Sequence, residues 1–593
     1  MKFVKVFLAG LLAFVVGSFV VSFLWIVILV GLAGSIGGSV TPVMNDSILK
    51  IDLSEMITDA PSTDPFAGID FQKMQAVPQL SLMQALRAID MAATDDRIKG
   101  IYLRMNGQGG IETAAMEELR ETIVQFKESG KFVVSYNESY TQGAYYLATA
   151  ADKIYLQPKG SFDWSGMASS LMFYKGLLDK LDLKVEIFRP TACKFKSAVE
   201  PFFLNKMSPE NRAQMQAMVD EMWQVITEAV SASRGISVEE LNRLADNLDV
   251  LLPEEALRHK LIDGVIYEDQ MNDLFAELGV KAEKEEYNFV TLGEYAAQVG
   301  ADLKNLSSPE VAIVYANGQI VDGEGEGKGP GIYGNTLAEQ IKAVRLDEQV
   351  KAVVLRVNSP GGSALASDVI WREMELLKAE KPVVVSMGSY AASGGYYISC
   401  PADVIVADKM TLTGSIGVFG MIMNPIDALK NKLGVTIDGV KTNRSSGMGT
   451  ITPLSHTERA AIMRGVDRVY TTFTNHVAEG RNLPIERVLE IAEGRVWSGA
   501  KALEIGLVDA NGGLKTAIAL AVDKAGLGER YRVVEKLETP TGLAAYISAF
   551  SARVKASWEA SELGVMMQQY REVQEALSQQ GVRMYSPYKI TIE

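Results

Sequence analysis

This chain repeats one module, and the repeat constrains its fold more than any single motif does. Residues 135–146 align without a gap on residues 386–397, at an offset of 386 − 135 = 251. In the second copy this segment contains Ala-Ala-Ser-Gly-Gly-Tyr-Tyr, and its Ser393 falls opposite Gln142 of the first copy. A repeated sequence builds a repeated structural unit. We therefore expect two similar modules, of which only one keeps a serine at this position.

The similarity extends along both copies in the same order. Further matches pair 102–106 with 355–358, 150–155 with 401–406, and 256–263 with 502–509. Short runs of β-branched residues alternate with helical patterns. Strands are expected at 47–53, 311–316, 351–357, 383–386 and 404–407, and helices at 337–344 and 364–377. Such alternation predicts an α/β fold with a largely parallel sheet in each module.

The N-terminus has a different character from the modules. Lys2 and Lys5 precede a charge-free run from Val6 to Asn45. About 20 apolar residues span a bilayer, so this run is long enough for one transmembrane helix. The positive-inside rule then places Met1 in the cytoplasm and everything after about residue 40 outside it. We predict a signal anchor in the cytoplasmic membrane, with the rest of the chain on the extracytoplasmic side; removal of the anchor is the alternative.

Composition excludes several classes of protein. At 593 residues the chain exceeds the usual domain of roughly 100–150 residues, so at least two cores are expected. The 58 basic and 73 acidic residues give a net charge of −15, which argues against nucleic-acid binding. Cys193 and Cys400 lack the spacing of a metal site or disulfide framework. The Gly-rich segment 323–331 lacks the context of a phosphate-binding loop and is expected to be mobile. No metal or cofactor is predicted.

Ser393 is the candidate nucleophile. It precedes the segment 394–400, which looks helical, so its hydroxyl should lie at a helix N-terminus at the open end of the sheet. The two glycines that follow it allow close approach of a substrate backbone. The segment 358–363, expected as a loop, can offer free N–H groups as an oxyanion hole. The plainer alternative is that both segments are only Gly-rich turns.

A nucleophilic serine needs a base, and histidine is the first candidate. The chain has three histidines. His259 falls opposite an isoleucine of the second copy, so the module does not require it. His456 is expected at a polar helix start, and His476 is expected after a helical run at 469–475. A Ser-His-Asp triad could therefore form only through His456 or His476.

Lysine is the other base that proteins use with serine. Such a lysine must lose its hydration so that it becomes neutral near the working pH. Lys194 and Lys196 lie in an unusually apolar stretch of the first copy. Composition alone favours an ordinary surface lysine at either position, so the residues leave the base undecided.

Four motifs together carry a resemblance to a known family. They are Lys-Ser-Ala-Val-Glu-Pro-Phe at 196–202, Asn-Ser-Pro-Gly-Gly at 358–362, Ala-Ser-Gly-Gly-Tyr at 392–396 and Leu-Thr-Gly-Ser-Ile-Gly at 412–417. In this order the chain resembles the signal peptide peptidase A (protease IV) family in its long, duplicated form, over nearly its whole length. The resemblance implies tandem Clp-protease/crotonase-like β-α superhelical modules, a serine endopeptidase that degrades cleaved signal peptides, no cofactor, and a homotetramer.

The resemblance also implies a role for each matched residue. Ser393 would be the nucleophile and Lys196 the general base, so each module would supply one member of a Ser/Lys dyad. Ser415 would orient the lysine, and the backbone N–H groups of Gly362 and Gly394 would form the oxyanion hole. Apolar signal-peptide remnants would be the substrate, and membrane lipid would surround the N-terminal helix.

The predicted organisation has four parts. They are the cytoplasmic start and anchor at 1–40, a module supplying the lysine at 41–290, a module supplying the serine at 291–535, and a helical extension at 536–593. The connection between the copies is expected at 280–305, and the helix of the extension at 559–578.

Two other functions fit parts of the pattern. The same fold serves acyl-CoA chemistry, in which paired N–H groups act on a thioester without a serine nucleophile. An inactive membrane-bound scaffold is the second alternative, and loss of the dyad from both copies would be its mark. The retained serine and lysine weigh against both.

Overall fold

The computed structural model describes most of both modules. The described residues are 17, 43–52, 56–62, 69–70, 75–76, 79–105, 111–282, 286–300, 308–325, 331–449, 452–537 and 581–585. The predicted signal anchor, apart from Gly17, and the predicted helix at 559–578 lie outside them. Among the described helices, none combines the length and apolarity needed to cross a membrane.

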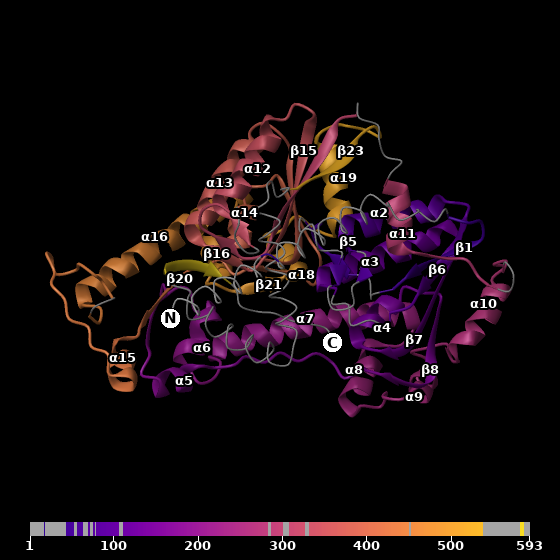
Figure 1. Cartoon of the computed structure of the whole chain (residues 1–593), viewed down its shortest axis with the longest axis horizontal. Helices are drawn as coiled ribbons and strands as arrows, with labels where there is room; N and C mark the ends of the chain where they lie inside the picture. The colour runs from indigo at the N-terminus through magenta and orange to yellow at the C-terminus, as the bar shows by residue number, and fades with distance from the viewer. Residues whose placement is uncertain are drawn as a thin grey trace, which may run out of the picture.

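The first module is built on a six-stranded sheet (Figure 1), in which every pair is parallel. Its order is β10-β8-β7-β6-β1-β11. The bounds are β1 Ser47–Ile51, β6 Ile98–Leu103, β7 Phe132–Tyr140, β8 Lys153–Phe162, β10 Gly264–Val265 and β11 Phe289–Thr291. Helices α2 (Leu82–Thr94) and α3 (Thr113–Phe126) contribute apolar faces to the core against this sheet.

The second module repeats the arrangement in an eight-stranded sheet. Its main path is β21-β19-β17-β15-β12-β23, and β18 and β22 branch from β17. The bounds are β12 Glu310–Asn317, β15 Val350–Ser359, β17 Val383–Ala392, β18 Val404–Ala407, β19 Leu412–Gly414, β21 Val496–Ser498, β22 Ala510–Asn511 and β23 Arg532–Lys536. Helices α12 (Gly334–Leu346) and α13 (Ala364–Lys378) pack against one another beside this sheet, and α19 (Leu514–Lys524) also contacts it (Figure 1).

A third sheet joins the modules. Its order is β14-β13-β16-β24-β20-β9, with bounds β9 Lys184–Phe188, β13 Ile320–Val321, β14 Ile332–Tyr333, β16 Gly361–Ser363, β20 Phe419–Asn424 and β24 Gly581–Tyr585. Strand β9 of the first module pairs antiparallel with β20 of the second, with Ile187 opposite Met421. The segment that runs from α5 (Lys175–Lys180) through β9 to α6 (Glu200–Phe203) therefore lies along the underside of the second module (Figure 1).

The duplication is visible in the helices as well as in the sheets. Helices α7 (Pro209–Arg234) and α16 (His456–Arg481) each have 26 residues, and the serine caps Ser208 and Ser455 begin them. Helix α4 (Gln142–Ala148) in the first module corresponds to α14 (Gly394–Ser399) in the second. The α/β fold with two copies of one module is confirmed.

Smaller elements complete the described chain. They are β2 Met56–Thr58, β3 Ile69–Asp70, β4 Gln75–Ala76, β5 Gln79–Ser81, α5 Lys175–Lys180, α6 Glu200–Phe203, α8 Val238–Asn247, α9 Pro253–Arg258, α10 Met271–Glu277, α15 Ile426–Leu433, α17 Ile485–Ile491 and α18 Gly499–Glu504, with 3-10 turns at Lys127–Ser129, Ser197–Val199 and Glu268–Gln270.

The structure differs from the sequence expectations at several points. The expected loop 358–363 contains strand β16, because β13 and β24 lie close enough to pair with its backbone. The segment 280–305 is more than a connection, since β11 and α11 (Leu292–Gly300) within it pack on β1. His476 lies inside α16 rather than after a helix. Of the expected helical extension, the described residues 581–585 form strand β24. The four-part division itself stays a prediction.

Candidate active site

Ser393 lies at the junction of β17 and α14 in a conformation that few non-glycine residues adopt. Its φ of 57° and ψ of −111° are unusual for an L residue. A serine before a helix normally caps it by accepting a backbone N–H. Ser393 makes no such bond, and its own N–H donates to the Gly414 carbonyl at 2.8 Å. The turn therefore leaves the hydroxyl available for another partner.

The predicted oxyanion residues lie together beside this serine. A Cβ added to Gly394 would lie 3.1 Å from the amide nitrogen of Gly362 and 2.8 Å from Ser367 Oγ. Such approach is possible only because residue 394 has no side chain. The backbone of β16 and the first turn of α14 therefore meet at one point next to Ser393.

Lys196 of the first module reaches Ser393 of the second. Its Nζ lies 2.6 Å from Ser393 Oγ, 2.9 Å from Ser415 Oγ and 3.0 Å from the Ser415 carbonyl oxygen. The side chains of all three residues are buried, and Lys196 is 1% exposed. Burial penalises the ammonium form and lowers the pKa of Lys196 to about 7, against a smaller opposing influence of Cys193.

The neighbouring lysine has a different environment. Lys194 Nζ lies 3.4 Å from a Glu493 carboxylate oxygen, and the Lys194 side chain is 60% exposed. The two lysines that composition left equivalent are thus a surface ion pair and a buried amine.

Ser415 is held by the backbone of the second module. It follows β19 with a φ of 49°, and its N–H donates to the Arg495 carbonyl at 2.7 Å. Both its hydroxyl and its carbonyl face Lys196 Nζ. A neutral amine has two N–H groups and one lone pair. If the N–H groups are directed at these two oxygens, the lone pair is left for Ser393.

One family model matches both modules of this chain. The family model for Peptidase family S49 matches residues 125–282 and 375–528, one stretch in each module. Together these stretches cover more than half of the chain. The chain belongs to peptidase family S49. Membership of this family indicates that the chain is a serine peptidase.

Individual S49 relatives match along most of the chain. "Protease 4" of Salmonella typhi is 37% identical over 86% of this chain and 83% of its own length. "Protease 4" of Haemophilus influenzae is 37% identical over 74% of this chain and 72% of its own length. "Serine protease SPPA, chloroplastic" of Arabidopsis thaliana is 32% identical over 80% of this chain and 70% of its own length.

Among solved structures, a membrane-bound stomatin-specific protease in complex with a substrate peptide is similar to part of this chain. It has 16% sequence identity and a TM-score of 0.26, and the match covers 42% of this chain and 99% of that protein.

At the position equivalent to Ser393, the first copy of this S49 peptidase has Gln142, whose side chain is hydrogen-bonded to the backbone. Gln142 donates from its amide to the Gly166 carbonyl at 2.9 Å and accepts from the Gly166 N–H at 2.8 Å. Thr141 caps α4 by accepting the Ala144 N–H. The amide of Gln142 thus bonds the strand–helix junction of the first copy to the loop after β8.

The three histidines lie away from the Ser393 hydroxyl. The His476 ring stacks on Trp371 at 3.6 Å between centroids, and its Nε2 lies 3.7 Å from the Asp368 carboxylate. His456 is exposed at the first turn of α16, and His259 ends α9. The partner of the Ser393 hydroxyl is Lys196, so the geometry favours the lysine alternative over the triad.

Two residues that the sequence did not single out hold the lysine in place. Gln214 on α7 donates to the Phe195 carbonyl and to Ser197 Oγ, and it accepts the N–H of Val496 in the other module. A Cβ on Gly494 would lie 2.6 Å from Lys196 Cβ, so only glycine fits there. The sequence signal for Gln214 is a glutamine among the buried methionines of α7. No sequence pattern indicates Gly494.

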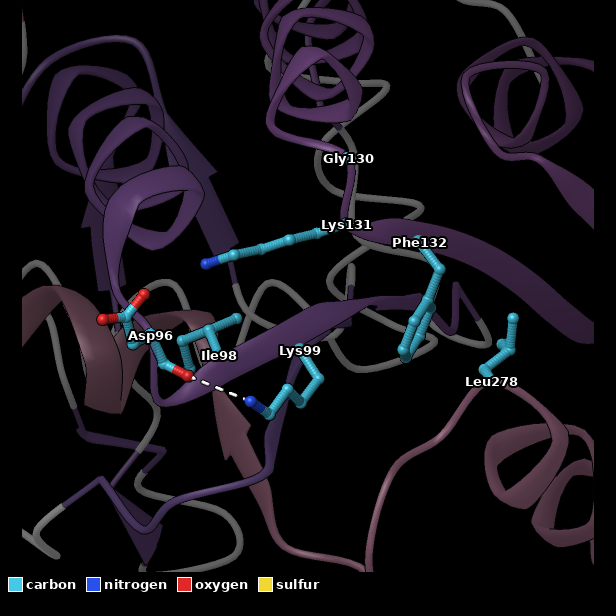
Figure 2. A pocket seen from close by; sticks show the side chains of 7 residues that line it. All are labelled: Asp96, Ile98, Lys99, Gly130, Lys131, Phe132 and Leu278. Atoms are coloured by element: carbon cyan, nitrogen blue, oxygen red, sulfur yellow. Dashed lines mark hydrogen bonds between the residues drawn. The ribbon is translucent and has the colours of Figure 1, made fainter.

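A separate cavity lies in the first module (Figure 2). Its volume is about 380 Å³, and the lining residues are Asp96, Ile98, Lys99, Gly130, Lys131, Phe132 and Leu278. Lys99 Nζ donates to the Asp96 carbonyl at 3.3 Å beside it. None of the predicted catalytic residues lines this cavity, so it is unconnected with the Ser393 chemistry.

Proposed function

We propose that this S49 serine peptidase cuts peptide bonds with a Ser393/Lys196 dyad shared between its two modules. The observation that carries the proposal is the 2.6 Å contact between Lys196 Nζ and Ser393 Oγ. A lysine with a pKa near 7 is partly neutral at physiological pH, which a general base must be. The carboxyl-terminal module alone lacks this base.

The chemistry follows from these positions. Neutral Lys196 accepts the Ser393 hydroxyl proton as Oγ bonds to the carbonyl carbon of the scissile peptide. The resulting oxyanion is stabilised by the N–H groups of Gly362 and Gly394. The ammonium of Lys196 returns its proton to the leaving nitrogen as the C–N bond breaks. A water molecule, deprotonated by Lys196, then hydrolyses the acyl-enzyme and restores Ser393.

We further propose that the substrates are apolar peptides, in particular cleaved signal peptides. The charge-free segment Val6–Asn45 suits a membrane anchor, which would hold the catalytic region at the outer face of the cytoplasmic membrane. Tethering an enzyme beside a membrane-bound substrate raises its effective concentration there. A homotetramer is part of this proposal and rests on the family resemblance.

The two alternatives are less consistent with the site. An acyl-CoA enzyme of this fold has no use for a buried lysine against a serine hydroxyl. A scaffold would have no reason to keep Lys196 at 1% exposure, because burying an amine without a function is unfavourable.

The test compares three alanine variants of the full chain. Ser393→Ala and Lys196→Ala should each lose fluorophosphonate labelling and cleavage of a signal-peptide substrate, by at least about a thousandfold, because the dyad acts as a unit. Lys194→Ala is the matched control and should keep both activities. Full cleavage by Lys196→Ala, with loss in His476→Ala, would show that the dyad is wrong.

A further inference from the structure

Helix α3 of the first module begins differently from its counterpart α13 in the second. At the repeat offset of 363 − 112 = 251, Glu112 falls opposite Ser363. Ser363 caps α13 by accepting the Ala366 N–H, as a serine before a helix usually does. Glu112 stands at the same position before α3 and makes no such bond to its own helix. Its carboxylate is therefore available to a partner elsewhere.

That partner comes from the second module. Glu112 accepts a hydrogen bond from Asn358 Nδ2 at 2.6 Å, a short distance that is typical of a charged acceptor. Ser389 takes over the capping of α3, since its Oγ accepts the Ala114 N–H at 3.1 Å. Asn358 and Ser389 are both buried. The start of a first-module helix is thus completed by two buried side chains of the other module.

Asn358 and Ser389 lie at a bulge between β15 and β17. Between two paired positions the register advances from Met387 to Ala391 along β17 but only by two residues along β15. Asn358 Oδ1 accepts the Tyr390 N–H at 3.1 Å across this bulge. Bulges bend strands and redirect side chains, often beside active sites. The Asn358 side chain therefore joins the two strands where both leave regular pairing.

Each strand continues from the bulge into a predicted catalytic element. Strand β15 is followed after Pro360 by β16, which contains the predicted oxyanion residue Gly362. Strand β17 ends at Ala392, directly before Ser393. The position of one strand relative to the other therefore sets the distance between the nucleophile and an oxyanion donor. Donors that are held in place before the reaction are the effective ones in such sites.

A further contact of α3 leads to Ser415. The buried Glu117 carboxylate accepts the Met410 N–H at 3.2 Å, and Met410 lies just before β19, which Ser415 follows. Thr411 donates from its hydroxyl to the Gly388 carbonyl of the bulge at 2.8 Å. One helix of the first module thus contacts the three segments that lead to the oxyanion strand, the nucleophile and Ser415.

We propose that α3 is a template for the catalytic strands of the second module, and that Glu112 is a positioning residue that acts through Asn358. This inference rests on the proposed function, since it takes Gly362 and Ser393 to be working parts of a peptide-cleaving site. An ionised carboxylate only accepts hydrogen bonds, so Glu112 keeps the Asn358 amide turned with its oxygen toward Tyr390. Without Glu112 that amide can rotate, and the oxyanion donor shifts relative to Ser393.

The first test compares variants of Glu112 in the full chain. Glu112→Ala should lower kcat for a fluorogenic peptide about tenfold with KM within about twofold, because a displaced oxyanion donor weakens the transition state more than substrate binding. Glu112→Gln should recover most of this loss, since its amide oxygen still accepts from Asn358. Glu121→Ala, at an exposed carboxylate of the same helix, is the matched control and should behave as the unaltered chain. An unchanged kcat in Glu112→Ala would overturn the proposal.

Reversing the hydrogen bond tests the same contact from the other side. Asn358→Asp places a second acceptor against Glu112 and should lower kcat by about a hundredfold. The Asn358→Asp/Glu112→Gln double variant again pairs a donor with an acceptor and should recover at least about tenfold of that loss. A double variant no faster than Asn358→Asp would overturn the proposal.

Two further outcomes are separable. If Asn358→Asp does not fold, as judged by urea unfolding, the comparison of Glu112→Ala with Glu112→Gln still decides, because Glu112 is exposed. Failure of the proposed function gives a different result, since Ser393→Ala would then cleave the peptide as fast as the unaltered chain.

Discussion

The two strand–helix junctions at Gln142 and Ser393 have the same place in the repeat and opposite chemistry. In the first copy, the Gln142 amide is engaged by the backbone of Gly166, and Thr141 caps the helix. In the second, Ser393 caps nothing and its hydroxyl meets Lys196 from the other copy. At the first junction, the side chain at the repeat position is hydrogen-bonded to the backbone of its own module. At the second junction, the side chain makes no bond to its own helix, and its hydroxyl is available to a residue of the other module.

Exchanging these two side chains should have the largest effect on activity. Ser393→Gln should abolish peptide cleavage and fluorophosphonate labelling, a loss of more than about a thousandfold, because it removes the proposed nucleophile. Gln142→Ser should leave activity unchanged and add no second labelled site. Lys196 Nζ contacts the Ser393 hydroxyl, whereas the Gln142 side chain, among the described residues, bonds the backbone of Gly166.

Labelling stoichiometry by intact mass measures both variants. A second fluorophosphonate on Gln142→Ser would contradict the view that the first copy lacks an activating base.

A second pair of equivalent residues, Arg104 and Arg356, should differ in what each contributes to the free energy of unfolding. Arg356 of β15 is fully buried, 2.6 Å from an Asp59 carboxylate oxygen and 2.8 Å from one of Glu118. Its counterpart Arg104 pairs with Glu138 and Glu268, which are 63% and 52% exposed. Asp59 and Glu118 belong to the first module, so Arg356 links the modules.

Arg356→Met should therefore destabilise the chain by about 3–5 kcal/mol, since it leaves buried carboxylates without a counter-charge. Arg104→Met is the control and should cost less than about 1 kcal/mol, because its partners are hydrated. Urea unfolding followed by fluorescence measures the difference. Equal shifts of the two midpoints would show that burial at Arg356 is unimportant.

Sequence reasoning found the second-module strands and helices because they are local. The β-branched runs and the serine at a helix start need only neighbouring residues to be recognised. Strand β16 was expected as a loop, because its partners β13 and β24 come from distant parts of the chain. Pairing between remote segments leaves no local pattern in two glycines.

The choice of base between Lys194 and Lys196 also depends on contacts between remote segments of the chain. Lys194 and Lys196 have the same composition around them, and only the family resemblance separated them. The structure separates them by exposure, 60% for the Lys194 side chain and 1% for Lys196. That difference arises from Gly494 and Gln214, which hold the Lys196 segment against the second module. Contacts between modules cannot be derived from either copy alone.

The smallest expected effect is a pH dependence set by this buried lysine. Below about pH 7, Lys196 is protonated and has no lone pair for the Ser393 proton. The rate of fluorophosphonate labelling should fall about tenfold for each pH unit below that value and be constant above it. Lys194→Ala should reproduce the profile, because that amine is exposed and paired with Glu493. Ser415→Ala should lower the plateau several-fold, since the lone pair of Lys196 would be less well directed at Ser393. A rate that does not change from pH 5 to pH 9 would contradict a lysine base and would leave the contrast between Lys194 and Lys196 without a chemical meaning.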